Sequence, residues 1–69
     1  MNIQPGDRVR AFTAAHEWIA LRAVTTVERG QDFPIVWVCD DNDWESAGDG
    51  SRPEGAIPWP AESIEEAKP

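Results

Sequence analysis

The sequence has little of what usually stabilises a very small protein. Its 69 residues are enough for one domain, and a chain of this length buries only roughly 60% of the surface that its unfolded form exposes. A single cysteine, Cys39, excludes an internal disulfide, and Cys39 with the only histidine, His16, gives too few ligands for a zinc site. We therefore expect no metal and no other cofactor, so stability has to come from large side chains.

Long apolar segments are also missing. The longest apolar run is Ile35 to Cys39, far short of the roughly 20 residues that a membrane helix needs. Residues 1–9 lack the apolar core behind a basic cluster that marks a signal peptide. With a free cysteine and no export signal, we expect a cytoplasmic protein that makes no contact with membranes.

Basic residues are scarce, with six Lys and Arg against thirteen Asp and Glu, and the net charge is −7. Charges balance over residues 1–36, so the whole excess lies in residues 37–69. That half repels phosphate backbones, and nucleic acid is therefore not the expected partner. Direct binding through Arg8, Arg10 and Arg22 in the neutral half stays open as an alternative.

Aromatic bulk is what the sequence does have. There are two phenylalanines and four tryptophans: Trp18, Trp37, Trp44 and Trp59. Each large aromatic side chain can bury roughly 150–250 Å², and we predict that most of this content is structural, with Trp18 and Trp37 in the core. Trp44 and Trp59 are either core or a binding surface, because flanking prolines hold Trp59 rigid and rigid aromatics form binding hot spots.

The first half reads as strands. Residues 7–13 alternate, with Val9 and Ala11 on one side, after a Pro-Gly turn. Period-2 alternation and β-branched residues predict a loop at 13–16 and one long strand at about 17–28. A helix from Ala14 to about Ala23 is the alternative.

A turn at residues 29–32 then leads to a strand at 33–40, which is apolar on both faces and therefore central. The two strands are expected to form a hairpin.

The second half begins with a short helix predicted at about residues 42–47. Asp41 or Asn42 caps it, Asn42 and Glu45 have capping-box spacing, and Trp44 anchors it. Gly48 and Gly50 are expected to end it.

A short strand is predicted at residues 55–57. Pro58-Trp59-Pro60 must lie at a sheet edge or leave the sheet, because proline has no N–H. Residues 61–66 are predicted to form a helical turn anchored by Ile64. The domain is expected to span residues 1–66, with a frayed end at 67–69.

This order of elements resembles an SH3-like barrel: mainly β, small, five-stranded and partly open, with a helical insertion at about 42–47 and a C-terminal helical turn. The VWVC run at 36–39, Trp44, and PEGAIPWPAE at 53–62 resemble a group of short proteins from actinobacteria and their phages. The likeness extends loosely to residues 6–9 and to Glu17-Trp18. The group has no assigned function, so the resemblance implies a fold and no site residues.

Catalytic and calcium-binding patterns are weak. Cys39 ends an apolar strand and His16 lies in a predicted loop, so we expect no Cys–His nucleophile and no enzyme. The spacing of Asp41, Asp43 and Glu45 matches the start of an EF-hand loop, but Ser46 and Arg52 stand where that loop requires glycine and glutamate. We expect neither a catalytic nor a metal site.

The function expected from the sequence is a small protein-interaction module, of the kind that a phage or mobile element uses as an accessory protein. An acidic surface would steer it to a basic partner surface, while tryptophans supply contact area. The predicted partner-binding residues are Trp44, Trp59, Asp40, Asp41, Asp43 and Glu45, with Asp49 nearby. The alternative is a nucleic-acid-related role, either as a mimic of DNA charge or by direct binding. We expect a monomer or a weak homo-oligomer.

Overall fold

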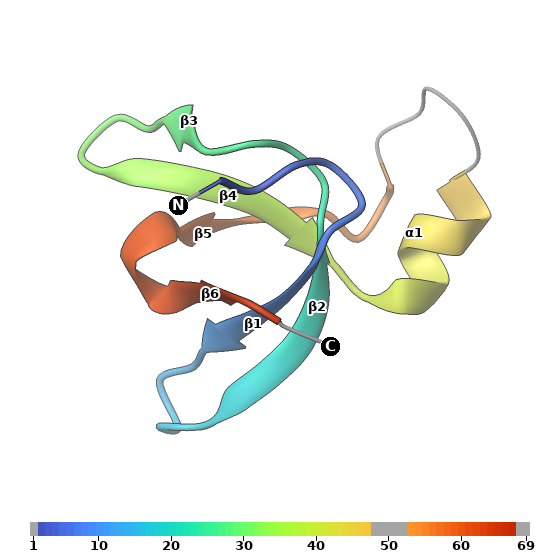
Figure 1. Ribbon diagram of the computed structural model, residues 1–69, viewed down its shortest axis with the longest axis horizontal. Helices are drawn as coiled ribbons and strands as arrows, with labels where there is room; N and C mark the ends of the chain where they lie inside the picture. Colours follow the sequence, from blue (N-terminus) through green and yellow to red (C-terminus); the bar gives the residue numbers. More distant parts are fainter. Residues whose placement is uncertain (1, 48–52, 68–69) are drawn as a thin grey trace.

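Antiparallel strands make up most of the structure, a computed structural model that describes residues 2–47 and 53–67 (Figure 1). The elements in chain order are β1 (Arg8–Phe12), β2 (Trp18–Ala23), β3 (Glu28–Arg29), β4 (Pro34–Cys39), α1 (Asp41–Ala47), β5 (Ile57–Pro60), the 3₁₀ helix η1 (Ala61–Ser63) and β6 (Ile64–Glu66). The strands form one sheet that curls into a half-barrel. The predictions of a mainly β fold and of a short helix after the central strand are confirmed.

The sheet is a meander whose last strand returns to its first. β1 pairs with β2 and with β6, and β4 pairs with β2, β3 and β5. The predicted central strand is therefore β4, which has neighbours on both edges. Ala67, the first residue of the end predicted to fray at 67–69, extends the last pairing by donating its N–H to the Arg8 carbonyl at 3.0 Å, and residues 68–69 lie outside the described residues.

The long strand predicted at 17–28 is interrupted, so the sheet has six strands and not five. β2 ends at Ala23 and β3 begins at Glu28. Between them Val24 donates its N–H to the Trp37 carbonyl at 2.7 Å, and the Thr25 hydroxyl accepts the Trp37 N–H at 3.2 Å. A side-chain oxygen thus replaces a main-chain acceptor, which bends the chain and interrupts the regular pairing. The alternative helix at 14–23 is wrong.

The C-terminal segment also differs from the prediction. The strand starts at Ile57 and includes both prolines, and it pairs with β4 alone, so it is an edge strand as expected for proline. Helical structure stops at Ser63, because Ile64 adopts an extended backbone and pairs with Ala11. Ile64 is nevertheless buried, in agreement with its predicted role as an anchor, as 3% of it is exposed.

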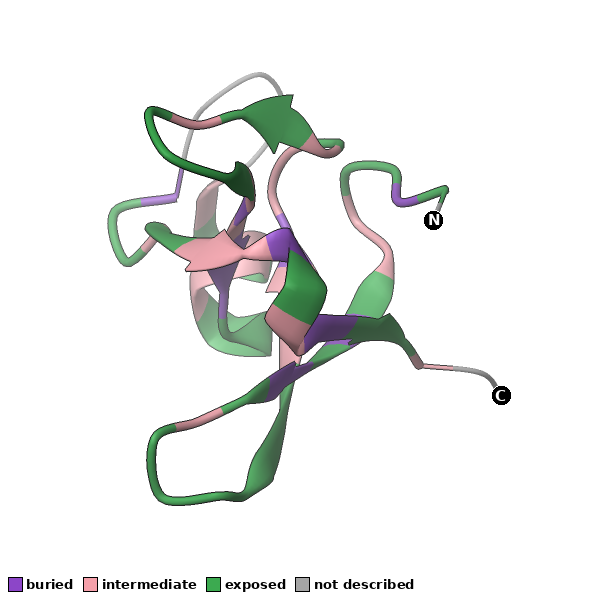
Figure 2. Cartoon of the chain, turned by 90° about the vertical axis from the view of Figure 1, so that its left-hand side faces the viewer, coloured by how far each residue is buried: buried purple, intermediate pink, exposed green. Residues whose placement is uncertain are grey.

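The core is aliphatic, contrary to the expectation of tryptophan in the interior. Its buried members are Ile3, Val9, Ala11, Ala23, Val36, Val38, Cys39, Ala61 and Ile64. Trp18 is 44% exposed, and Trp37 is half-buried. Strand alternation explains this, since Trp18 pairs across from Phe12 on the side of the sheet opposite to Val9 and Ala11. Figure 2 shows the buried residues concentrated at the centre, while the projecting β1–β2 hairpin is almost wholly exposed.

Two isoleucines provide a matched test of where the core lies. Ile64→Ala should lower the free energy of unfolding by about 2–5 kcal/mol, because it leaves a cavity in the interior. Ile57→Ala, at a position that is 48% exposed, should cost well under half as much. Urea denaturation of both variants measures the difference, and equal losses would contradict this core.

Candidate functional site

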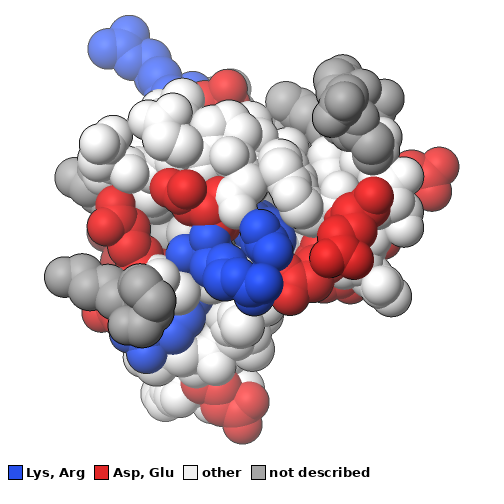
Figure 3. All heavy atoms as spheres, turned by 45° about the vertical axis from the view of Figure 1, so that its right-hand side comes forward, with Lys and Arg blue, Asp and Glu red and all other residues white. Residues whose placement is uncertain are grey.

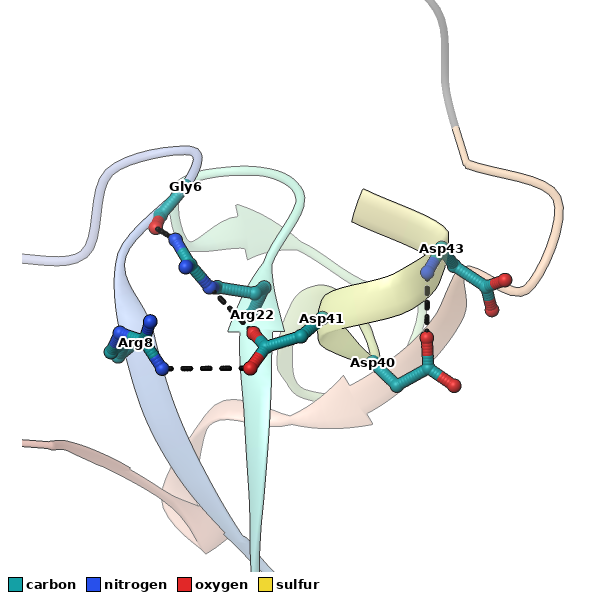
Figure 4. Close-up of polar contacts among 6 residues, drawn as sticks. All are labelled: Gly6, Arg8, Arg22, Asp40, Asp41 and Asp43. Carbon is teal, nitrogen blue, oxygen red and sulfur yellow. Dashed lines mark hydrogen bonds and ion pairs between the residues drawn. The ribbon is translucent and has the colours of Figure 1, made fainter. Parts of the chain in front are cut away.

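All four predicted acidic site residues lie at or just before α1, but the carboxylates of two of them, Asp40 and Asp41, have partners inside the protein. Asp40 caps the helix, since its Oδ1 accepts the Asp43 N–H at 2.7 Å (Figure 4). The cap is therefore one position earlier than the predicted Asp41 or Asn42. The reason is that β4 ends at Cys39, which makes Asp40 the first residue free to leave extended structure.

Asp41 joins α1 to the sheet. Its Oδ1 accepts the Arg22 Nε at 2.7 Å, and its Oδ2 lies 3.5 Å from Arg8 Nη1 (Figure 4). Arg8 and Arg22 stand directly opposite each other on β1 and β2, where two like charges repel. The hydrogen bond from Arg22 lowers the pKa of the Asp41 carboxyl, with smaller contributions from the charges of Arg8 and Arg22. Asp41 thus offsets a repulsion within the fold.

Cys39, on β4, lies in the same cross-strand row as Arg8 and Arg22, because it pairs with Arg22 on β2. It is 3% exposed. Burial raises the pKa of the Cys39 thiol, and the negative charges of Asp43, Asp40 and Asp41 raise it further. Such a thiol is a weak nucleophile. His16 lies in the β1–β2 loop, at the opposite end of β2, so the structure does not bring the two groups together.

Trp44 anchors α1, as predicted, by packing against the turn at Gly6 near the N-terminus of the chain. Gly6 has a φ of +91°, and a Cβ atom there would lie 3.1 Å from Trp44 Cζ2. Glycine thus serves both the left-handed backbone and the close approach of the indole. The Gly6 carbonyl accepts Arg22 Nη1 at 2.8 Å, which fixes this turn to β2 as well.

Trp59 lies apart from the α1 residues, on β5. It pairs with the buried Val36 and packs against the core. Its indole Nε1 is buried with no hydrogen-bond partner among the described residues. The structure therefore groups Trp44 with the acidic residues and leaves Trp59 as part of the barrel wall. Asp49 lies outside the described residues.

Sequence reasoning missed a hollow between the β3–β4 turn and β5. It has a volume of about 240 Å³ and is lined by Phe33, Ile35, Pro58 and Pro60, with Gly30, Gln31 and Asp32 at the turn. Ile35 and Pro60 are directly paired across the strands, and Phe33 is 48% exposed. A larger open hollow of about 600 Å³ lies along residues 27–34 of the same turn. Proline alternation in β5 was the available signal, because Pro58 and Pro60 share one face.

A second missed feature is the cluster of rings on the β1–β2 hairpin. The Phe12 and Trp18 ring centroids lie 5.1 Å apart, and His16 stacks on Phe12 at 5.9 Å. The Arg10 guanidinium lies 5.6 Å from the Trp18 ring centre. The alternation of residues 7–13 places Phe12 on the same side as Arg8 and Arg10, which indicates an exposed ring. The assumption that aromatic side chains fill the core leads to the opposite expectation.

The arginines proposed for nucleic-acid binding are all ion-paired. Arg8 and Arg22 share Asp41, and Arg10 pairs with Glu65 at 2.6 Å. Within residues 2–47 and 53–67, no group of three or more His, Cys, Asp or Glu side chains is placed to hold a metal ion. No helix in that part of the chain has the length and apolar character to cross a membrane.

Comparison with protein-family models, with curated proteins and with solved structures gave no match to this chain. The site has to be interpreted from its own geometry.

The Asp41 ion pairs predict a specific pH dependence of stability. Because the pKa of Asp41 is lowered in the folded state, its charge stabilises the fold at pH values above the ordinary aspartate pKa of about 3.9. This stabilisation is lost as the pH falls through the lower pKa of the folded state. Asp41→Asn should therefore lower the free energy of unfolding at neutral pH, and the gap to the wild type should close below about pH 4.

Glu45→Gln is the matched control, because Glu45 is exposed and has no ion pair within the described residues. It should leave stability almost unchanged at every pH. Guanidinium titrations at several pH values measure both, and a gap for Asp41→Asn that persists in acid would refute the role given to its charge.

The unpartnered indole of Trp59 gives another stability prediction. A buried donor without an acceptor costs about 1–3 kcal/mol, so Trp59→Phe should destabilise the protein by less than about 1 kcal/mol despite the lost volume. Trp59→Ala should cost at least about 3 kcal/mol. A large loss for the phenylalanine variant in chemical denaturation would mean that the N–H has an acceptor.

Proposed function

We propose that this protein is an SH3-like, non-catalytic module that binds a protein partner with a basic surface. The observation that carries the proposal is the hollow beside the β3–β4 turn. It is lined by Phe33 and Pro58, which are exposed, and by Ile35 and Pro60, which are half-buried. Exposed apolar surface of this kind typically marks an interaction site.

The topology supports the SH3-like assignment. A meander is followed by a 3₁₀ turn, and the last strand then pairs with the first. That is the order expected of a small five-stranded barrel if β2 and β3 are counted as one bent strand. Fold alone does not assign function, so the proposal depends on the hollow.

The chemistry of the hollow favours an apolar side chain next to a cationic one. Its volume of about 240 Å³ suits a single large side chain. Proline and phenyl rings present flat faces to it, while Asp32 adds a carboxylate at the rim. Glu28 and Arg29 line the adjoining larger hollow. A partner segment with a large apolar residue beside a lysine or arginine fits both features.

The overall charge of −7 acts at longer range. It would speed encounter with a basic surface and disfavour an acidic one. Asp40, just before α1, and Glu45, on α1, are exposed and can contribute to this steering, whereas Asp41 is neutralised by two arginines. We therefore propose that the acidic residues steer the partner at long range and do not contact it directly.

Direct nucleic-acid binding is the less favoured function. The three arginines available for it are already paired with carboxylates, and a polyanion would be repelled by the net charge.

Selection from a random peptide display library tests the proposal even though the partner is unidentified. Recovered peptides should combine an aromatic or large aliphatic residue with lysine or arginine. In fluorescence anisotropy, Phe33→Ala should weaken binding of the best peptide by about tenfold or more, since it removes a central apolar contact.

Phe12→Ala is the control, because that ring is also exposed but lies on the other hairpin. It should leave the peptide affinity unchanged. Acidic consensus peptides, or an affinity insensitive to Phe33→Ala, would rule the hollow out as the contact site.

A further inference from the structure

The outer side of the β1–β2 hairpin carries an exposed patch that the hollow does not use. We call it the hairpin face and define it as Arg10, Phe12, His16, Trp18 and Ala20. Phe12 is 37% exposed and Trp18 is 44% exposed. The contacts of His16 with Phe12 and of Arg10 with Trp18 keep these rings in place, which lowers the entropy lost when they bind.

Phe12 and Trp18 remain exposed, and within the described residues no third strand pairs with the loop end of this hairpin. Pairing of β6 with β1 ends at Ala11, and pairing of β4 with β2 involves only Arg22 and Ala23. The hairpin therefore extends past both neighbouring strands, as Figure 1 shows for its loop end. The hollow at the β3–β4 turn lies on a different hairpin.

The charges around the hairpin face are mixed. Three arginines, Arg8, Arg10 and Arg22, lie on this side of the sheet with their carboxylate partners Asp41 and Glu65. The five groups sum to one positive charge, in a chain whose net charge is −7. Figure 3 shows basic side chains gathered between acidic ones on one face of the molecule.

This arrangement restricts the occupant. A uniformly basic partner surface would be repelled by the arginines, and a uniformly acidic one would be repelled by the carboxylates and by the overall negative charge. A surface with both signs and exposed rings is complementary, and the hairpin face is such a surface itself. We propose that the hairpin face binds a second copy of this chain, forming a two-fold dimer.

In a two-fold dimer the same patch meets itself. Phe12 and Trp18 of one copy then pack on those of the other. Arg10 and Glu65 already pair within one copy at 2.6 Å, so they can share partners across the interface. An approach through the acidic surfaces would instead bring together two copies of charge −7 where they repel most.

The size of the patch sets the strength of the dimer. A standard interface buries about 800 Å² on each partner, which is a large share of the 4870 Å² that the whole chain exposes. The hairpin face has only two large rings, Phe12 and Trp18, and we therefore expect a weak dimer that forms only at high protein concentration. It leaves the hollow accessible and does not depend on the proposed function.

Sedimentation velocity of the full chain, from low micromolar to millimolar protein, tests the proposal. The average mass should rise from that of one copy towards that of two. Trp18→Ser should weaken the dimer by about tenfold or more, whereas Phe33→Ser, at a similarly exposed position, should leave it unchanged. Dispersed amide NMR spectra establish that both variants fold.

Isotope-filtered NMR on a mixture of labelled and unlabelled protein gives a second readout. Contacts between copies should involve the indole of Trp18 and the ring of Phe12. A single-copy mass at every concentration would overturn the proposal. So would higher oligomers, or a dimer that is lost with Phe33→Ser and retained with Trp18→Ser.

Discussion

The side chain of Arg22 connects three parts of the protein that are distant in sequence. It donates to the Gly6 carbonyl of the N-terminal turn and to the Asp41 carboxylate of α1, while its own backbone lies in β2. The Arg22 side chain is 18% exposed and that of Asp41 is 55% exposed, so the part-buried bond to the Gly6 carbonyl is better shielded from solvent than the bond to Asp41. Since the core is small and aliphatic, this polar junction fixes where the helix and the N-terminus lie on the sheet.

The position of α1 has consequences for its acidic residues. Held against the sheet by Asp41 and by Trp44 over Gly6, the helix lies next to the cross-strand row that ends in Cys39. The carboxylates at this helix therefore have roles within the fold. Asp40 caps the helix, Asp41 pairs with Arg8 and Arg22, and the charge of Asp43 helps to raise the pKa of Cys39. The exposed large aromatic side chains are Phe12 and Trp18 on the β1–β2 hairpin and Phe33 in the β3–β4 turn, away from this helix.

Local patterns in the sequence are sufficient for most elements, and non-local contacts account for the errors. Alternation locates β1, a short run that is apolar on both faces locates the central β4, and the proline rule places β5 at an edge. The bend after Ala23 depends on hydrogen bonds to Trp37, which lies on a different strand. Size alone favours the core for Trp18, whereas its pairing with Phe12 holds it on the outer side. Proline alternation in β5 indicates one wall of the smaller hollow, but the hollow itself depends on how the β3–β4 turn lies against that strand.

The composition of β5 affects how the protein behaves when crowded. Pro58 and Pro60 have no N–H, so the outer edge of this strand offers few donors to an incoming chain. Open-ended stacking of strands is thereby blocked along one border of the sheet. One route to fibril formation is thereby obstructed in a domain that exposes aromatic rings on its hairpins.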